Sequence, residues 1–208
     1  MISRGRLAAG IGAAAALGPA AYLLFWRSRC LTWGARGNEV TADLAGDELL
    51  PGADLVTTRA ISIDAAPEEI WPWLAQLGSG RGGAYTYDWI ENLLGLNMHS
   101  ASRILPQFQD IKAGDELPLG SGGPVMRVEV LDPPRALAVR AADQNWVWSF
   151  VLLPDGASTR LISRNRIATA NMSRAGRLFY TLLMEPGSLV MERKMLLGIK
   201  QRAERAKG

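Results

Sequence analysis

The polar and aromatic side chains that could do chemistry are densest between residues 85 and 103. This stretch contains Tyr85, Tyr87, Asp88, Trp89, Glu91, Asn92, His99, Ser100 and Arg103. An imidazole beside a carboxylate can move protons, so His99 with Glu91 or Asp88 is the best acid–base pair that the chain offers. A hydrogen-bonded structural role for His99 stays open, because no serine or cysteine is arranged beside it as a nucleophile.

Aromatic side chains alternate along a second segment, residues 146–153. Alternate side chains of a strand share one face. One face of this segment therefore carries Trp146, Trp148, Phe150 and Leu152. We expect this face to point toward the interior, where it either lines a binding cavity or packs as ordinary core.

The following strand alternates small polar residues with arginines. Ser163 and Asn165 alternate with Arg160, Arg164 and Arg166. Burying three unpaired arginines is prohibitive, so we expect Ser163 and Asn165 to point inward. There they are candidate polar contacts for a ligand, with water or the backbone as the alternative partners.

One carboxylate falls within the apolar stripe of the last helix. The stripe consists of Leu189, Glu192, Leu196, Ile199 and Ala203, which share one helical face. A buried carboxylate needs a partner or a raised pKa. Glu192 is therefore either a structural hydrogen-bond anchor, or a ligand contact or acid–base group.

The composition excludes several kinds of site and partner. The chain has 208 residues, of which 48% are hydrophobic and 21% are charged, as in a folded protein. A single cysteine, Cys30, and a single histidine exclude a disulfide framework and the common zinc sites, so we expect no metal and no cofactor. The net charge is only +3 and no segment resembles a nucleic-acid-binding motif, so we expect no nucleic-acid partner.

The hydrophobic pattern indicates one α+β domain. It predicts a strand over 55–64, a helix from Pro67 to Gly78 in which Pro72 introduces a kink or shortens the helix, and a second short helix over 85–95. Further strands are expected near 115–120 and over 125–131, 137–141, 146–153 and 159–168. Helices are expected over 174–184 and 188–205, separated by a break at 185–187.

Four segments carry a family resemblance: GDELLP at 46–51, APEEIWPWL at 66–74, RGGAYTYDWIEN at 81–92 and MERKMLLGIK at 191–200. With the order of the elements, they resemble the START/Bet v 1-like superfamily, also called SRPBCC or polyketide cyclase/dehydrase-like, and in particular a bacterial subgroup of it. The resemblance implies a helix-grip fold, in which a curved antiparallel sheet wraps around the long C-terminal helix and encloses an apolar cavity. It implies binding of hydrophobic molecules and no single reaction, because the superfamily mixes carriers, cyclases and sensors.

The N-terminus carries a long uncharged segment. From Leu7 to Trp26 there are twenty residues without a charge, flanked by two arginines on each side. Such a helix spans about 30 Å, the thickness of the hydrocarbon core of a bilayer. We therefore expect a single-pass anchor in the cell membrane, with a weak preference for a cytoplasmic N-terminus. A cleaved signal peptide with its site near 18–20, or a soluble hydrophobic tail, is the alternative.

These patterns divide the chain into an N-terminal anchor (1–26), a linker (27–50) and the helix-grip domain (51–208). The leading hypothesis is a membrane-tethered module that binds a hydrophobic small molecule or lipid in the cavity. Its candidate ligand contacts are Tyr85, Tyr87, Trp89, His99, Trp146, Trp148, Phe150, Ser163, Asn165 and Glu192.

The alternative hypothesis is a cyclase/aromatase-like or hydrolyase-like enzyme that acts on a polyketide-like substrate. In that case Tyr85, Tyr87, His99 and Glu192 would converge on one pocket and shuttle protons. A third hypothesis is that the pocket has collapsed and that the protein acts only by interacting with other molecules. The scarcity of cysteine and histidine favours binding over catalysis, so no residue is assigned as catalytic, and the sequence predicts no oligomeric state.

Overall fold

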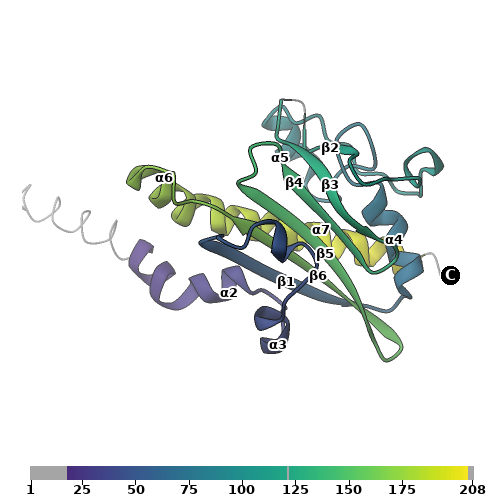
Figure 1. Cartoon of the computed structure of the whole chain (residues 1–208), viewed down its shortest axis with the longest axis horizontal. Helices are drawn as coiled ribbons and strands as arrows, with labels where there is room; N and C mark the ends of the chain where they lie inside the picture. The colour runs from purple at the N-terminus through teal and green to yellow at the C-terminus, as the bar shows by residue number, and fades with distance from the viewer. Residues whose placement is uncertain (1–17, 121, 206–208) are drawn as a thin grey trace, which may run out of the picture.

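A six-stranded antiparallel sheet forms the centre of the computed structural model, which describes residues 18–120 and 122–205. The strand order is β1-β6-β5-β4-β3-β2. The long helix α7 (Glu185–Arg205) lies along one face of this sheet, which we call the inner face (Figure 1). This is the α+β helix-grip arrangement that the sequence predicts.

Each predicted strand is present, with ends that differ by a few residues. The strands are β1 (Leu55–Ile63), β2 (Glu116–Pro118), β3 (Val125–Asp132), β4 (Ala136–Ala141), β5 (Trp146–Asp155) and β6 (Ser158–Ile167). The β5–β6 pairing continues as far as Asp155 and Ser158. The turn between these strands is therefore shorter than expected, since only Gly156 and Ala157 connect them.

Short helical segments connect the strands. They are α2 (Arg27–Leu31), α3 (Gly37–Thr41), α4 (Pro67–Ala75), α5 (Asp88–Leu93), α6 (Arg174–Phe179), the 3-10 turns η2 (Asp47–Leu49) and η3 (Pro106–Phe108), and the π-helical turns η1 (Tyr22–Trp26) and η4 (Tyr180–Met184). Helix α4 runs through Pro72 and ends at Ala75, before the expected stop at Gly78. Helix α5 begins later than predicted because Tyr85 has a left-handed backbone, with φ of 58°, that a right-handed helix does not accommodate.

The core lies between α7 and the inner face of the sheet. The predicted stripe of α7 faces it, and Leu196, Ile199 and Ala203 are fully buried. These residues belong to one apolar cluster with side chains from the inner face of the sheet, among them Ile63, Phe150, Leu152 and Leu161. The aromatic face of β5 therefore points inward, as expected.

The predicted helix break at 185–187 is wrong. The backbone stays helical from Arg174 through η4 into α7, and both Tyr180 and Glu185 have right-handed helical dihedral angles. Pro186 has no N–H and its ring crowds the preceding turn of an α-helix. The π turn immediately before it, closed by the hydrogen bond from Glu185 N–H to Tyr180 O, widens the helix there and accommodates the proline.

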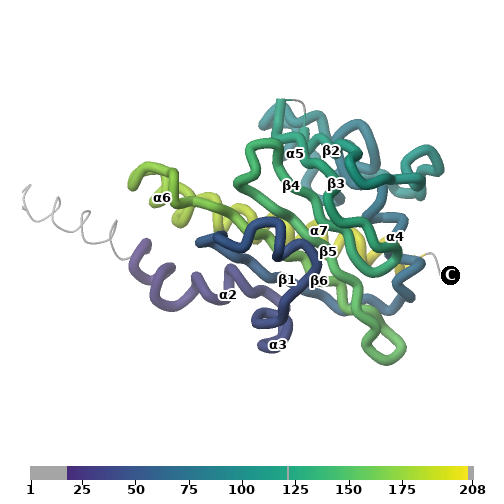
Figure 2. Tube along the Cα trace, viewed as in Figure 1, coloured from purple at the N-terminus to yellow at the C-terminus, as the bar shows by residue number. Residues whose placement is uncertain are grey.

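Residues 27–50, expected as a linker, pack against the domain: α2 contacts α7 and β1, and the segment that follows crosses the outer face of the sheet. Within them, Cys30 and Glu39 are buried, and the Ala60 N–H of β1 donates to the Trp33 carbonyl at 3.1 Å. We call residues 34–51 the strap. Figure 2 shows the strap crossing in front of β6 and β5 before the chain turns back into β1. Apolar strap residues pack there on the outer-face side chains of Ala60, Val151 and Ile162.

The predicted anchor is only partly covered by the structure. Residues 7–17 lie outside the described residues, and residues 18–26 are helical. Across 18–120 and 122–205, no helix combines the length and the apolar character that crossing a membrane requires.

Candidate functional site

The predicted site residues fall into two groups. The inner cluster lies between α7 and the inner face of the sheet; hydrogen bonds connect the predicted residues Trp146, Trp148, Ser163, Asn165 and Glu192 with Arg59, which was not predicted. The predicted residue Phe150 packs beside Trp148. The loop cluster lies in and around α5 and consists of Tyr85, Tyr87, Asp88, Trp89 and His99. The two groups have different partners.

Two indole groups hold the polar side chains of the inner cluster. Trp146 Nε1–H donates to Asn165 Oδ1 and Trp148 Nε1–H donates to Ser163 Oγ, each at 2.8 Å. The antiparallel register sets Trp148 opposite Asn165, so each indole reaches a neighbour along the adjacent strand. The two indole rings stack, with centroids 5.9 Å apart and an interplanar angle of 20°. Ser163 and Asn165 therefore point inward, as predicted.

Glu192 is the centre of the inner cluster. Its Oε2 accepts hydrogen bonds from Arg59 Nη1 and from Asn165 Nδ2, the latter at 3.2 Å. The Arg59 guanidinium is fully buried and also donates to the Cys30 carbonyl at 3.1 Å and to Ser188 Oγ at 3.0 Å. The carboxylate predicted to lie in the stripe is thus paired with a strand arginine.

The sequence interpretation missed Arg59, although a signal was present. Every second side chain of the strand over 55–63 points to the same face. Arg59 shares its face with Leu55, Thr57, Ile61 and Ile63. It is therefore a charge on the apolar face of its strand, just as Glu192 is a charge in the apolar stripe of its helix. Two buried charges of opposite sign on facing elements predict each other, because neither is tolerated alone.

One oxygen of Glu192 lacks a well-formed hydrogen bond in the described part of the chain. Glu192 is only 7% exposed, and no hydrogen bond of standard geometry reaches its buried Oε1, although the Ser163 hydroxyl interacts with the carboxyl and lowers its pKa. Burial raises the pKa of this carboxyl above its ordinary value, although the charge of Arg59 opposes the shift. An unsatisfied buried acceptor carries a desolvation cost of about 1–3 kcal/mol, so Oε1 is a position at which a hydrogen-bond donor would be favourable.

A second buried carboxylate connects α7 to the N-terminal helix. Glu185 accepts hydrogen bonds from Arg27 Nη2 on Oε1 at 2.8 Å and from Arg27 Nε and Tyr22 Oη on Oε2, each at 2.9 Å. We call Tyr22, Arg27 and Glu185 the clasp. Tyr180 of η4 lies within the electrostatic reach of both carboxylates: burial raises the pKa of its phenol, and the charge of Glu185 adds to the shift.

The expected apolar cavity is not open in this structure. The void on the inner face has a volume of about 10 Å³ and is lined by Leu77, Leu117, Leu119, Leu137, Val139, Trp148 and Phe150. A space of this size holds at most about one water molecule. Side chains between α7 and the sheet fill the expected cavity, and a ligand would have to displace some of them. Trp146 and Trp148, which are half-buried, border the solvent side of the cluster.

Tyr85 and Asp88 of the loop cluster serve to hold loops together. Tyr85 is buried, donates from Oη to the Trp73 carbonyl at 3.0 Å and lies against the Arg202 guanidinium, 4.7 Å from its ring centroid. Asp88 accepts hydrogen bonds from the Ser100 N–H at 2.8 Å and from Ser100 Oγ at 2.6 Å. These contacts fix the loops on either side of the start of α5.

The remaining members of the loop cluster are more accessible. Tyr87 is half-buried, with Lys194 Nζ 5.5 Å from its ring centroid. Trp89 is 69% exposed and His99 is exposed. Glu91, in contrast, is buried, and burial raises the pKa of its carboxyl. No hydrogen bond within the described residues joins His99 to Glu91 or Asp88, so the predicted acid–base pair is not assembled.

The four residues of the enzyme hypothesis do not share a set of partners. Tyr85 contacts Arg202, whereas Glu192 precedes Arg202 by ten residues on the same helix, a distance of about 15 Å along the axis. The Tyr85 hydroxyl is already bonded to the Trp73 carbonyl. The structure brings Trp146, Trp148, Phe150, Ser163, Asn165 and Glu192 together and leaves Tyr85, Tyr87, Trp89 and His99 apart from them.

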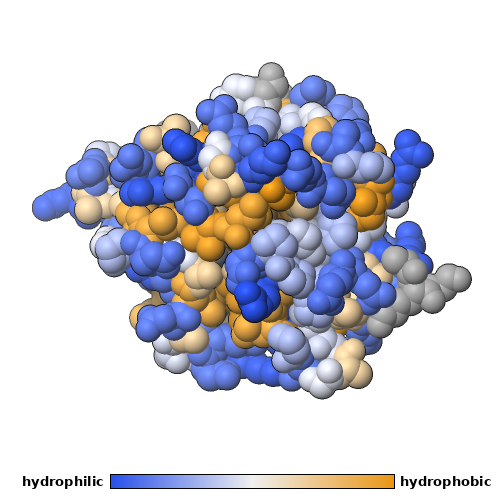
Figure 3. Space-filling view, turned by 45° about the vertical axis from the view of Figure 1, so that its right-hand side comes forward, coloured by the Kyte–Doolittle hydropathy of each residue, from blue (hydrophilic) through white to orange (hydrophobic). Residues whose placement is uncertain are grey.

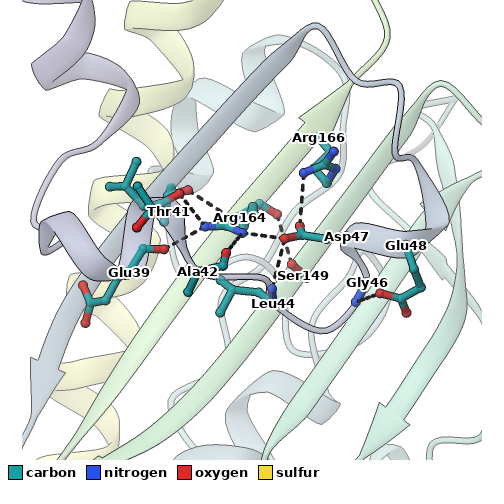
Figure 4. Close-up of polar contacts among 12 residues, drawn as sticks. Glu39, Thr41, Ala42, Leu44, Gly46, Asp47, Glu48, Ser149, Arg164 and Arg166 are labelled. Carbon is teal, nitrogen blue, oxygen red and sulfur yellow. Dashed lines mark hydrogen bonds and ion pairs between the residues drawn. The ribbon is translucent and has the colours of Figure 1, made fainter.

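The outer face of β6 contains the three arginines, which are paired and largely covered. Arg164 donates to Asp47 Oδ2 at 2.6 Å and to the carbonyls of Glu39 and Ala42, as Figure 4 shows. It also donates to Thr58 Oγ1 at 3.0 Å and to the Val40 carbonyl. Arg166 donates to the carbonyls of Leu50 and Pro51. The arginines point outward, as predicted, but each is matched by the strap, which is why their burial is tolerated.

A groove of about 270 Å³ lies beside these arginines, between the strap and the sheet. The Arg164 guanidinium that lines it already donates from Nε, Nη1 and Nη2 to oxygens of the protein. Arg166 also lines the groove, where its Nη1 lies 3.5 Å from Asp47 Oδ1, so both arginines of the groove are balanced by a carboxylate of the strap. Across the described residues, no group of histidine, cysteine and carboxylate side chains is placed to hold a metal ion.

No family model matches the chain, and no curated protein matches it. Among solved structures it is similar to protein MLL2253 from Mesorhizobium loti, with 16% identity over 73% of this chain and 98% of that one and a TM-score of 0.43. It is also similar to Aha1 from Colwellia psychrerythraea, solved as a dimer, with 17% identity over 74% and 99% and a TM-score of 0.43. A Polyketide_cyc-like protein, Cgl2372 from Corynebacterium glutamicum, has 15% identity over 73% and 87% and a TM-score of 0.35. At these identities the likeness concerns the fold alone.

Proposed function

We propose that the protein binds a hydrophobic small molecule or lipid at the inner cluster, with a hydrogen-bond donor of that ligand at Glu192. The observation that carries the proposal is Glu192 Oε1, a buried carboxylate oxygen that receives no hydrogen bond of standard geometry from the described residues. A neutral hydroxyl or amine could donate to this oxygen without bringing a second negative charge into the interior.

The surroundings of Glu192 fit an apolar ligand with one polar end. The Trp146 and Trp148 rings and Phe150 form a continuous aromatic surface, with Trp148 and Phe150 centroids 4.8 Å apart. The indole N–H groups are already bonded to Ser163 and Asn165 and present only ring surface to a ligand. Binding sites for small molecules commonly combine such apolar walls with a few fixed polar groups.

Because the inner face contains a void of only about 10 Å³, binding needs a rearrangement of side chains. The half-buried indoles border the cluster on its solvent side, and their displacement would open space next to Glu192. The apparent affinity for a ligand is lowered by the free energy that is needed to reach the open state. A closed unliganded state is therefore part of the proposal.

Membrane tethering through residues 7–26 is a further part of the proposal. Its support is the uncharged run itself, together with the clasp that ties the described end of this segment to Glu185 of α7. The enzyme hypothesis has no such support, because Tyr85 and His99 do not share partners with Glu192.

The test compares two probes of similar length, dodecanol, which has a hydroxyl donor, and methyl dodecanoate, which has none. The full chain in detergent micelles is titrated with each probe, and the indole N–H resonance of Trp148 is followed by nitrogen-15 NMR. This resonance is assigned with the variant Trp148→Phe. We expect dodecanol to shift it at lower concentration than methyl dodecanoate.

The matched variant is Arg59→Met with Glu192→Leu, which removes both buried charges and keeps apolar volume. We expect it to lose the preference for dodecanol. Equal responses of the unaltered protein to both probes, or an unchanged preference in the double variant, would contradict a site at Glu192.

A further inference from the structure

Two helical segments extend beyond the sheet at the same end of the molecule. Figure 1 shows η1 and α2 on one side and α6 on the other, both at the left of the view. The clasp joins them, since Tyr22 and Arg27 from the first segment bond to Glu185, the first residue of α7, directly after η4. The α6–η4 helix therefore starts from a fixed base beside the N-terminal helix.

The side chains at this end are apolar and exposed. We call them the apolar end; on the first segment they are Leu23, Leu24, Phe25 and Trp26, and on the second Leu178, Phe179, Leu183 and Met184. Figure 3 shows apolar surface gathered toward the left of that view, the end at which α6 lies. Phe179 is 56% exposed and Trp26 is 63% exposed, which is unusual for large aromatic groups in such number on one surface.

The charges within the two segments that form the apolar end are of one sign. Residues 18–31 and 170–184 contain four arginines, Arg27, Arg29, Arg174 and Arg177, and no aspartate or glutamate. Glu185, the first carboxylate that follows, is buried and bonded to Arg27. An apolar surface with a positive rim and aromatic side chains is the pattern of segments that lie in the interface of an anionic bilayer.

A second copy of the chain fits this surface less well. A symmetric pair would bring the four arginines of one copy against the four of the other, without an exposed carboxylate in either segment to balance them. The chain that precedes residue 18 also points to lipid, because it continues the same uncharged run back to Leu7.

We propose that α6–η4 (Arg174–Met184) is a second membrane contact, which lies in the interface of an anionic bilayer beside the N-terminal helix. The contact rests on described residues and does not depend on a ligand at Glu192. It would orient the first turns of α7 toward the lipid.

The test uses the full chain reconstituted in phosphatidylcholine vesicles with or without phosphatidylglycerol. Cys30 is replaced by serine, which keeps a donor to the Glu185 carbonyl, and the single new cysteine of Leu183→Cys carries the environment-sensitive fluorophore NBD. A matched label at the exposed Ser102, as Ser102→Cys, serves as the control on a remote loop. Iodide in the buffer and doxyl-labelled lipids report whether each label faces water or acyl chains.

We expect the label at position 183 to be shielded from iodide and quenched by doxyl lipids in the vesicles with phosphatidylglycerol, and less so without it. The label at position 102 should stay accessible to iodide in both. Arg174→Gln with Arg177→Gln should weaken the docking of position 183 about tenfold, since each arginine near an anionic surface contributes to binding.

Two results would overturn the proposal. One is iodide quenching at position 183 equal to that at 102 in both kinds of vesicle. The other is shielding of position 183 in detergent, without vesicles, that grows with protein concentration, because it would identify a second copy of the chain as the occupant.

Discussion

Arg160 of β6 and Glu39 of α3 form a two-point ion pair on the outer face of the sheet. Arg160 Nε donates to Oε1 and Nη2 donates to Oε2, each at 2.8 Å, and both residues are less than a tenth exposed. Arg160 Nη2 also donates to the Gly34 carbonyl at 2.9 Å. This pair fixes the beginning of the strap to the sheet.

Replacing Glu39 by alanine should strongly destabilise the fold. The change leaves the Arg160 guanidinium buried without its carboxylate, which costs about 3–5 kcal/mol of unfolding free energy. Urea denaturation measures this loss, and Asp155→Asn, which weakens the more exposed pair with Arg36, should cost much less. Equal losses in the two variants would show that the strap does not depend on the buried pair.

The same carboxylate should make stability depend on pH in the acid range. Burial alone would raise the pKa of Glu39, but hydrogen bonds from Arg160 and from the Arg36 N–H hold it below its ordinary value. A group with a lowered pKa in the folded state stabilises the fold above its unfolded pKa of about 4.3, and loses this contribution as the pH falls through the folded value. The unfolding free energy of the unaltered protein should therefore fall more steeply between about pH 5 and pH 3 than that of Glu39→Gln. Parallel slopes would contradict the expectation.

The Arg59–Glu192 pair predicts a dependence of the opposite sign. In Arg59→Met, Glu192 loses the charge that opposes its raised pKa, so the pKa rises further. A raised carboxyl pKa contributes stability below the unfolded pKa and loses it as the pH rises through the folded value. The destabilisation of Arg59→Met, about 3–5 kcal/mol near neutral pH, should thus shrink as the pH is lowered. Adding Glu192→Leu should restore most of the stability and remove the pH dependence, and a double variant as unstable as the single one would refute this account.

Alanine substitutions at two glycines of α7 test how tightly that helix packs against the loop at Tyr85. A Cβ at Gly198 would lie 2.5 Å from the Tyr85 carbonyl oxygen and 2.9 Å from Tyr85 Cβ, whereas a Cβ at Gly187 would meet nothing within 4 Å. Gly198→Ala should cost about 1–3 kcal/mol by pushing α7 from the loop. Gly187→Ala should gain up to about 1 kcal/mol of helix propensity. The thermal unfolding temperatures distinguish the two variants. A higher unfolding temperature in both would contradict tight packing of α7 against the loop at Tyr85.

Periodic patterns predicted most of the fold and the inner half of the site. The stripe of α7 and the alternation on β5 and β6 each have a strict period, so the faces of Glu192, Trp148 and Asn165 followed from position alone. The resemblance predicted that the sheet and the helix would face each other, which periodicity does not provide.

The remaining errors come from long-range contacts and from one local geometry, none of which follows from a periodic pattern. The strap shows no periodicity, and its order comes from arginines more than a hundred residues later in the chain, such as Arg164 with Asp47. The helix through Pro186 is continuous because a π turn absorbs the proline, a local geometry that no residue type announces. The loop cluster was overestimated because Tyr85 and Asp88 are polar side chains that satisfy backbone groups, and their partners, Trp73 and Ser100, become evident only after folding.

The clasp also decides how a mechanical load would travel through the molecule. Tension applied to the N-terminal helix reaches Tyr22 and Arg27, and both hold the first residue of α7. The load therefore enters the long helix and is shared by its whole contact with the sheet, instead of peeling β1 from β6 one hydrogen bond at a time. Under tension, the N-terminal helix, α7 and the sheet would move as one body.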